Sequence, residues 1–288
     1  MKMLTTAAAA LLLPLLAMSC GRAEGGGRNM IQNKGSDTLV NVAQAWAEQY
    51  REVNPDTVVV VSGGGSGTGI SSMINGTVDI ANSSRAMKPS EIEAATANGH
   101  EPIEHIVGFD ALAVYVHPSN PIESITIEQL AAIYGNDGTA NNWSDMGITI
   151  PGLDDDEIVR ISRQNNSGTY AYFREAVLGK KGKFKLGSRD LHGSKDVVDT
   201  CEKTPGAIGY SGLAYATEHV KLVPVVGVDG MPVTPSVETA ADGSYAIARP
   251  LFMYTAGEPV GDIKAYMDWI LSDAGQAIIA KKGYAPAK

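Results

Sequence analysis

A run of β-branched residues that ends in a glycine-rich stretch constrains the fold of this chain more than any other feature. Residues 57–61 read TVVVV, the pattern of a buried strand in a parallel sheet. The stretch SGGGSGTG, residues 62–69, follows at once, and a short segment at 69–74 is predicted to be a helix. A strand, a tight loop and a helix in this order are typical of α/β proteins.

The same alternation continues along the chain. Strands are predicted at 30–33, 57–61, 78–81, 111–116, 158–162, 207–210, 222–226 and 251–254, and helices at 39–53, 69–74, 89–97, 125–133, 169–178, 194–202, 263–271 and 274–281. The first three strands and their helices make a βαβαβ unit, which indicates a parallel sheet with helices on its faces. A second α/β set begins after 111–116, so two lobes are expected.

The C-terminal helices are expected to return to the first lobe, and the chain then crosses between the lobes twice. We place the crossings near 107–110 and 249–252. The predicted division is residues 30–108 with 250–288 as lobe I and residues 109–249 as lobe II. A length of 288 residues with 44 % hydrophobic residues is enough for cores of this size.

The N-terminal residues differ from the rest of the chain. Lys2 is followed by an uncharged segment rich in Ala and Leu that is too short to span a bilayer, so residues 1–19 are predicted to be a secretory signal peptide. The segment ends in LAMSC, which resembles a bacterial lipobox and predicts lipid attachment at Cys20. The alternative is ordinary signal cleavage nearby with an incidental Cys20. The Gly-rich residues 20–29 are predicted to be a flexible tether.

Charge and composition exclude several classes of function. The net charge is −9, and removal of residues 1–19, which carry only Lys2, gives −10. Such a chain is a poor candidate for nucleic-acid binding, and its overall field repels small anions, so any anion must be held by local donors. The five His residues lack metal-ligand spacing, and no metal or cofactor is expected. Cys201 has no partner if Cys20 carries lipid, and is expected to be a small buried apolar residue.

Four segments that follow predicted strands carry small hydroxyl residues and glycine. They are GSDT at 35–38, SGGGSGTG at 62–69, DIANSSR at 79–85 and RQNNSGT at 163–169. Hydroxyl groups and the free backbone N–H groups of a helix start suit an anion. In the last segment Arg163 offers paired donors that match an oxyanion, and Ser167 and Thr169 add O–H donors.

Three of the four segments also have a simpler interpretation. Ser36 and Asp37 fit ordinary N-caps, the glycine-rich stretch fits a flexible turn, and Arg163 fits a surface salt bridge. The sequence of residues 62–69 does not match the motif of a Walker loop, of a dinucleotide-binding loop or of the nucleophile elbow of a hydrolase. A phosphatase or esterase that uses Ser66 or Ser167 would need a positioned base, and none of the four segments contains His, so binding is favoured over catalysis.

Taken together, these segments resemble the periplasmic phosphate-binding proteins of ABC importers, the PstS family, from about residue 30 to 284. The most specific part of this resemblance is the motif R-x-x-x-S-G-T at 163–169. The resemblance implies an α/β fold with two lobes, type II-like, with a double-crossover hinge and one buried phosphate. The family's ligand positions fall on Thr38, Leu39, Ser66, Ser84, Arg163, Ser167, Gly168 and Thr169.

One of these positions departs from the family pattern. Ser84 stands where the family often has an Asp that accepts the proton of hydrogen phosphate and so rejects sulfate. Asp37 is a possible replacement for that acceptor. The departure puts the selectivity for phosphate in doubt, although the oxyanion site itself is still expected.

The expected function is that of an exported solute-binding protein that captures phosphate in an interlobe cleft and delivers it to an ABC transporter permease. We expect a monomer in the periplasm or on the outer face of the cell membrane, anchored through Cys20. The alternatives are a binding protein for another oxyanion, such as sulfate or molybdate, and a phosphate sensor or scavenger that takes no part in transport.

Overall fold

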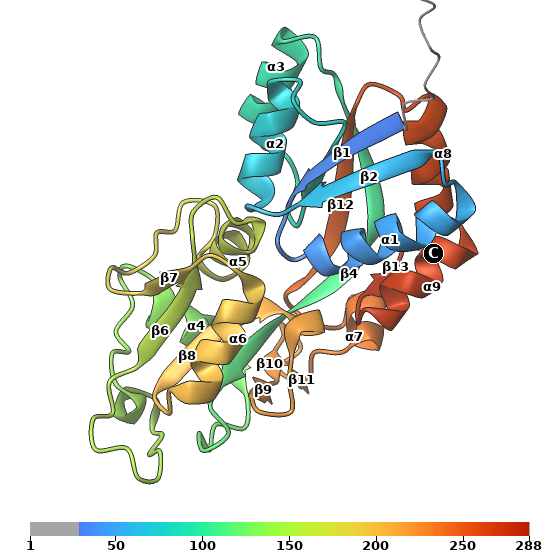
Figure 1. Cartoon of the computed structure of the whole chain (residues 1–288). Coiled ribbons are helices and arrows are strands. Elements are labelled where there is room, and N and C mark those ends of the chain that lie inside the picture. Colours follow the sequence, from blue (N-terminus) through green and yellow to red (C-terminus); the bar gives the residue numbers. More distant parts are fainter. Residues whose placement is uncertain (1–28, 288) are drawn as a thin grey trace, which may run out of the picture.

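The computed structural model describes residues 29–287, and the predicted signal peptide, Cys20 and residues 20–28 of the tether lie outside this range. Figure 1 shows two α/β lobes that share one long mixed sheet. Its strand order is β2-β1-β3-β12-β4-β8-β6-β7, with β9 and β13 also paired to β4.

Most predicted elements are present with small shifts in their bounds. The strands are β1 (Asn29–Gly35), β2 (Thr57–Ser62), β3 (Ile80–Ser83), β4 (Pro102–Val116), β5 (Ile125–Thr126), β6 (Val159–Arg163), β7 (Arg189–Leu191), β8 (Ala207–Gly212), β9 (Lys221–Val223), β10 (Val225–Val226), β11 (Pro232–Val233), β12 (Ala248–Ala256) and β13 (Ala285–Pro286). The α-helices are α1 (Val40–Val53), α2 (Ser66–Ile74), α3 (Pro89–Ala97), α4 (Ile127–Tyr134), α5 (Gly168–Leu178), α6 (Ser194–Lys203), α7 (Val237–Ala241), α8 (Gly261–Ile270) and α9 (Asp273–Lys281).

Lobe I is the predicted βαβαβ unit completed by the C-terminal segment. Strand β1 pairs in parallel with β2 and β3, and β12 runs antiparallel to β3. Helices α1, α8 and α9 cover one face around buried Trp46 and Tyr266, and α2 and α3 cover the other around Met73 and Ala95. Helices α8 and α9, at the C-terminal end of the described chain, therefore pack against α1.

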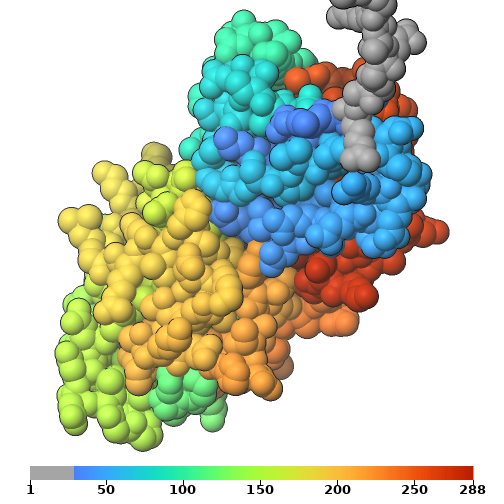
Figure 2. Space-filling view, in the orientation of Figure 1, coloured from blue at the N-terminus to red at the C-terminus, as the bar shows by residue number. Residues whose placement is uncertain are grey.

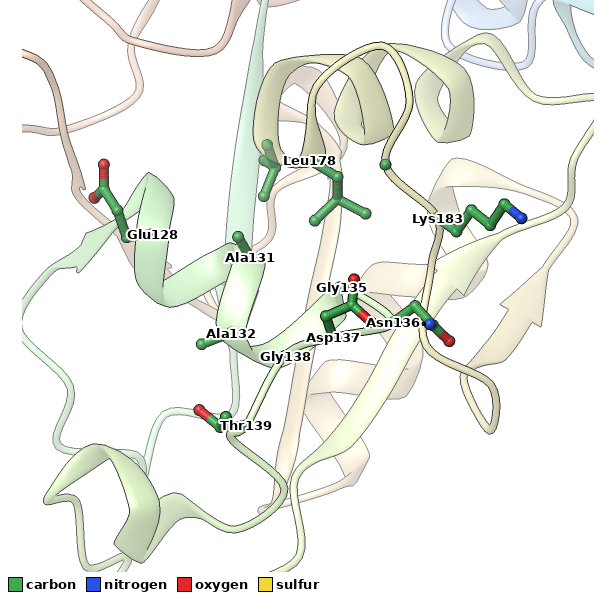
Figure 3. Close-up of a pocket in the computed structure, with 12 residues that line it drawn as sticks. Glu128, Ala131, Ala132, Gly135, Asn136, Asp137, Gly138, Thr139, Leu178 and Lys183 are labelled. Carbon is green, nitrogen blue, oxygen red and sulfur yellow. Dashed lines mark hydrogen bonds between the residues drawn. The ribbon is translucent and has the colours of Figure 1, made fainter.

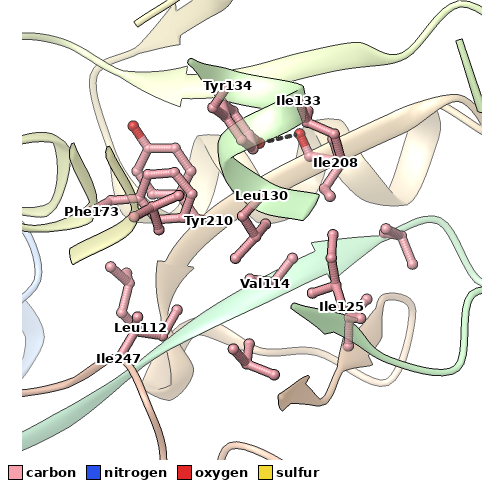
Figure 4. Close-up of a cluster of buried hydrophobic side chains, with 14 of the residues drawn as sticks. Leu112, Val114, Ile125, Leu130, Ile133, Tyr134, Phe173, Ile208, Tyr210 and Ile247 are labelled. Atoms are coloured by element: carbon pink, nitrogen blue, oxygen red, sulfur yellow. Dashed lines mark hydrogen bonds between the residues drawn. The ribbon is translucent and has the colours of Figure 1, made fainter. Parts of the chain in front are cut away.

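Lobe II has its own core on the α4–α5 face of β8 and β6. Phe173 stacks on Tyr210 with ring centroids 3.7 Å apart, and the Tyr134 hydroxyl donates to the Ile208 carbonyl at 2.8 Å, as Figure 4 shows. Helix α6 covers the opposite face, where Cys201 is fully buried. Burial raises the pKa of the Cys201 thiol to about 12, so it is a protonated core residue at neutral pH, as predicted.

Strands β4 and β12 run side by side from one lobe into the other. Ala248 to Ala256 pair antiparallel with Ala111 to Pro102, with a bulge between Leu251 and Phe252. The prediction of a strand limited to 111–116 was wrong, because β4 begins at Pro102. Its first half contains Glu104 and His105 on partly exposed positions, so it lacks the continuous apolar run that marks its second half.

Two further expectations need correction. Strand β2 is parallel but forms the edge of the sheet, and Val60 is 38 % exposed, so its apolar run is not buried on both faces. Helix α2 begins at Ser66 instead of residue 69, which places half of the glycine-rich stretch in the first turn of a helix. The start of α2 matters for the site, because the N–H of Gly67 in its first turn donates to the Asn166 carbonyl of lobe II.

Candidate functional site

Three helix N-termini meet at the boundary between the lobes. Helices α1 and α2 of lobe I and α5 of lobe II each follow a strand of the shared sheet, and none has an acidic residue in its first turn. Unpaired N–H groups and the positive end of the helix dipole favour an anion at such a position. The space-filling view in Figure 2 shows the two lobes in contact along this boundary.

Hydroxyl groups from the two lobes touch directly at this point. The Oγ1 atoms of Thr38 in lobe I and Thr169 in lobe II lie 3.1 Å apart, and both residues are about 1 % exposed or less. Nearby, the Gly67 N–H donates to the Asn166 carbonyl at 2.9 Å, and the Asn166 amide donates back to Gly64 at 3.0 Å. The lobes are therefore in a closed arrangement.

A cluster of three serine hydroxyls completes the lobe I side. The Ser36 hydroxyl donates to Ser84 Oγ at 3.0 Å, and Ser84 Oγ lies 3.3 Å from Ser66 Oγ. Ser66 Oγ also accepts the Ser84 N–H at 3.0 Å. All three side chains are buried, and Gly168 of lobe II packs against Ser66 and Ser84 so closely that a Cβ on Gly168 would lie 2.2 Å from Ser66 Oγ.

Arg163 is buried at the end of β6, as the sequence motif suggested, but most of its donors are engaged by the protein. Its guanidinium donates to the main-chain oxygens of Leu191 and His192, to Ser194 Oγ at 3.0 Å and to Asp37 Oδ2 at 3.3 Å. One N–H of Nη1 has no acceptor among residues 29–287. The ion pair with Asp37 joins the lobes, so the surface salt bridge considered above does not describe this Arg, which is only 1 % exposed.

A second buried guanidinium, that of Arg249 on β12, was not predicted as part of the site. Arg249 Nη2 donates to Thr169 Oγ1 at 3.1 Å and to Thr38 Oγ1 at 3.3 Å, and Nη1 donates to the Ser84 carbonyl at 3.2 Å. Asp110 Oδ2 on β4 accepts from Nη2 at 2.8 Å and from Nε at 3.1 Å. Arg249 therefore lies beneath the threonine pair at the place where both connecting strands pass between the lobes.

Two features of the sequence indicate the ion pair between Arg249 and Asp110. Arg249 interrupts an apolar segment, and a fully buried Arg needs an anionic partner. Asp110 precedes the strongly apolar run 111–116 and is similarly isolated. Neither was predicted to be a ligand residue, because the pairing of β4 with β12 that sets them opposite each other is not visible in the sequence.

The charges at the site balance before any ligand is added. Arg163 and Arg249 contribute two positive charges, and Asp37 and Asp110 contribute two negative charges. Burial lowers the pKa of Arg163; the Asp37 carboxylate opposes this shift and Arg249 adds to it. Burial raises the pKa of Asp110, and the Arg249 guanidinium opposes that shift. An anion held here must therefore depend on hydroxyl and N–H donors as well as on the arginines.

The other predicted residues occupy distinct places. Ser167 is the N-cap of α5, and its Oγ accepts the N–H groups of Thr169 and Tyr170. Asp37 has both carboxylate oxygens bonded, Oδ1 to the Gly64 N–H at 2.9 Å and Oδ2 to Arg163. Leu39 packs in the lobe I core, and its N–H donates to the Ser36 carbonyl at 3.1 Å, so it contributes no free donor to the cleft.

A groove of about 630 Å³ reaches Arg249 from one side of the boundary between the lobes. It is lined by residues of both lobes: Arg85, Ala86, Met87, Lys88, Pro89, Ala171, Tyr172, Arg174, Glu175, Ala176, Lys180, Arg249, Pro250 and Phe252. A separate cavity of about 380 Å³ lies beside α4 in lobe II (Figure 3), and none of the predicted site residues lines it.

Among residues 29–287 there is no cluster of three or more His, Cys, Asp or Glu side chains suited to a metal ion. The same residues include no helix that is long and apolar enough to cross a membrane.

Comparison with known proteins gives consistent results. The profile of the PBP superfamily domain matches residues 21–274. The chain is 34 % identical to protein SphX of Synechococcus elongatus over 96 % of this chain and 85 % of that protein. It is 32 % identical to the phosphate-binding protein PstS of Pseudomonas aeruginosa over 89 % of this chain and 82 % of that protein.

Solved structures agree on the architecture. A phosphate ABC transporter substrate-binding protein from Clostridium perfringens, crystallised with bound phosphate, superposes with a TM-score of 0.79 at 29 % identity and covers 90 % of this chain and 100 % of its own. PstS from Borrelia burgdorferi superposes with a TM-score of 0.60 at 27 % identity, over 90 % of this chain and 99 % of its own. These matches confirm the predicted α/β fold with two lobes. The chain belongs to the PBP superfamily and, within it, to the PstS family of phosphate-binding proteins.

Proposed function

We propose that this chain captures inorganic phosphate between its lobes and delivers it to the membrane permease of an ABC importer. The observation that carries the proposal is the contact between Thr38 and Thr169, one hydroxyl from each lobe, above the Arg249 guanidinium and among three helix N-termini. A tetrahedral oxyanion at this point would receive donors from both lobes and hold them together. The Clostridium perfringens relative was crystallised with bound phosphate.

The proposed ligand residues come from both lobes. They are Thr38, Ser66 and Ser84 in lobe I, Arg163, Ser167, Gly168 and Thr169 in lobe II, and Arg249 at the crossing. Leu39 stays adjacent to this set through its main chain only. We infer that 30–108 with 250–288 moves as one body and 109–249 as the other, and that closure is the state that a permease recognises. We expect the protein to act as a monomer.

The selectivity for phosphate is proposed to depend on acceptors near Ser84. A hydroxyl can accept the proton of hydrogen phosphate, but Ser84 Oγ already accepts from Ser36, and Asp37 is bonded to Arg163 and Gly64. A carboxylate has further lone pairs, so Asp37 remains the stronger acceptor of the two. If neither group accepts, sulfate and molybdate should bind as well as phosphate does.

We infer that the site binds its ligand without a covalent step. Ser66 Oγ is bonded to the hydroxyl and the N–H of Ser84, and Ser167 Oγ accepts two N–H groups of the first turn of α5. An activated serine nucleophile instead requires a base that removes its proton. PstS of Pseudomonas aeruginosa and the Clostridium perfringens protein are named as binding proteins, which fits this inference.

Arg163→Ala should weaken phosphate binding by about 1.5–3 kcal/mol, the value of one hydrogen bond from a charged donor, because one N–H of Arg163 remains for the ligand. Isothermal titration with phosphate, sulfate, arsenate and molybdate, on both sides of the second ionisation of phosphate, measures affinity and selectivity together. Arg189→Ala, which removes an exposed Arg on the neighbouring strand β7, is the matched control. Unchanged phosphate affinity in Arg163→Ala would rule out the proposed site.

We also propose that the protein is held at the outer face of a membrane by a lipid on Cys20. The sequence features are the apolar segment, the small residues before Cys20 and the glycine-rich residues after it. Cys20→Ser should move the protein from the membrane fraction to the soluble fraction in the producing cell, as followed by immunoblotting. Cys201→Ser is the control, because that thiol is buried and should not affect fractionation. Retention of Cys20→Ser on membranes contradicts the anchor.

A further inference from the structure

Lobe II contains a buried arginine that the phosphate site does not use. Arg160 on β6 is 8 % exposed, and its Nε and Nη1 atoms have no hydrogen-bond partner among residues 29–287. Arg160 lies three residues before Arg163 on the same strand, so the two side chains leave opposite faces of the sheet. Burial of a guanidinium without an acceptor is unfavourable, because its hydration is lost and not replaced.

A cavity of about 270 Å³ adjoins this arginine. It is lined by Tyr170, Arg174, Gly182, Lys183, Phe184, Lys185, Leu186, Gly187, Ser188 and Asp190. Arg160 Nη2 approaches the lining at Gly187, where it is 3.6 Å from the position of a Cβ atom. Two other buried polar atoms of the lining, Arg174 Nε and Ser188 Oγ, also have no partner among residues 29–287. Unpartnered atoms of Arg174 and Ser188 therefore belong to residues that line one cavity, and the unpartnered guanidinium of Arg160 lies beside it at Gly187.

The local charge is strongly positive in a chain that is acidic overall. Arg160, Arg174, Lys183 and Lys185 supply four positive charges against one negative charge from Asp190, which leaves three. Burial lowers the pKa of Lys185, and the Arg160 guanidinium adds to this shift while Asp145 opposes it. The Lys185 ammonium donates a hydrogen bond to Asn141 Oδ1 at 3.0 Å, at the edge of this cluster of positive charges.

We propose that this cavity is a second anion site, which takes a compact oxyanion of two or more negative charges. The Arg160 guanidinium would be its principal donor, with Arg174 and Ser188 completing the contacts. Arg163 leaves the other face of the sheet, and Thr38 and Thr169 do not line this cavity, so the second site and the interlobe cleft should fill independently. This site goes beyond the proposed capture of phosphate and does not depend on it.

The test uses pyrophosphate as the probe, with the purified full chain already loaded with one equivalent of phosphate. Isothermal titration at low ionic strength should show one further saturable binding event. Arg160→Met should weaken pyrophosphate binding at least about tenfold, because hydrogen bonds from a charged donor are lost. Arg189→Met, which removes the same charge from the exposed surface of β7, should keep wild-type pyrophosphate affinity, and both variants should keep wild-type phosphate affinity in the cleft.

Thermal unfolding provides a second measurement that also works if Arg160→Met folds poorly. Pyrophosphate should raise the melting temperature of the wild type, and Ser188→Ala and Lys185→Gln should each reduce that rise. The proposal is overturned if pyrophosphate binds no more than one equivalent in total, displacing phosphate from the cleft. It is also overturned if Arg160→Met and Arg189→Met weaken binding equally, since the effect is then general electrostatics.

Discussion

Arg249→Met is expected to lower the free energy of unfolding by about 3–5 kcal/mol, because it leaves the carboxylate of Asp110 buried without its cationic partner. Asp110 and Arg249 are each about 1 % exposed and are joined by two hydrogen bonds. The same substitution removes the donor that Arg249 places between Thr38 and Thr169, so phosphate affinity should fall as well. Urea unfolding followed by circular dichroism measures the change in stability. Titration calorimetry in buffer without urea measures the change in phosphate affinity.

The double variant Asp110→Asn/Arg249→Met distinguishes a structural role from a binding role. The double variant no longer buries an unpaired carboxylate, so part of the unfolding free energy should return, reduced by the cost of burying the new amide at position 110 without its partner. Phosphate affinity should remain low, because no donor is restored beneath the threonine pair. Recovery of phosphate affinity together with stability would show that Arg249 acts on the ligand only through the fold.

Gly168→Ala is expected to reduce phosphate affinity at least about a hundredfold, with little change in stability. The added methyl group would lie 2.2 Å from Ser66 Oγ and 2.6 Å from Ser84 Oγ, both in the opposite lobe. Such contacts are not tolerated, so the lobes cannot close fully, and binding would lose the donors of one lobe, each worth about 1–3 kcal/mol. Gly168 is the first residue of α5, where Ala is a good helix former.

Gly227→Ala is the matched control for this substitution. A Cβ on Gly227 would meet only the Asp229 carboxylate at 3.3 Å and Ala246 at 3.9 Å, and neither is a proposed ligand residue. Small-angle scattering should show that phosphate compacts the wild type and Gly227→Ala but not Gly168→Ala. If Gly168→Ala binds phosphate with wild-type affinity, the closed contact between the lobes is not part of the bound state.

The two ion pairs of the site leave it without an excess of positive charge. Asp110 binds Arg249 at the crossing, so this guanidinium is held in place and neutralised before the ligand arrives, whereas Asp37 neutralises Arg163 across the boundary when the lobes are closed. Preorganised donors lose little conformational entropy on binding. The ligand's own charge is then stabilised by hydroxyl groups and helix N-termini, which suits an acidic protein whose net field repels anions.

Local patterns in the chain were sufficient to predict the α/β fold and most of its helices and strands. Apolar periodicity predicted most strands and helices, and helix α3 has the predicted bounds, because each of these signals depends on neighbouring residues. The motif at 163–169 predicted an Arg at a strand end followed by a helix start with two hydroxyl groups, because a βα junction forms within a few residues of chain. That Ser167 caps α5 and that Gly168 packs closely against the other lobe came only from the structure.

Tertiary structure alone decided which of these groups meet. Strand β2 lies at the edge of the sheet in spite of its apolar run, since strand order depends on pairing between distant segments. Arg249 reaches Thr38 and Thr169 because β12 pairs with β4 across the lobes, and 80 residues separate Arg249 from Thr169 in the chain. Hydroxyl residues and glycines at strand ends are readable in the sequence, but the partner of each donor is set by long-range pairing and closure of the lobes, which no local pattern encodes.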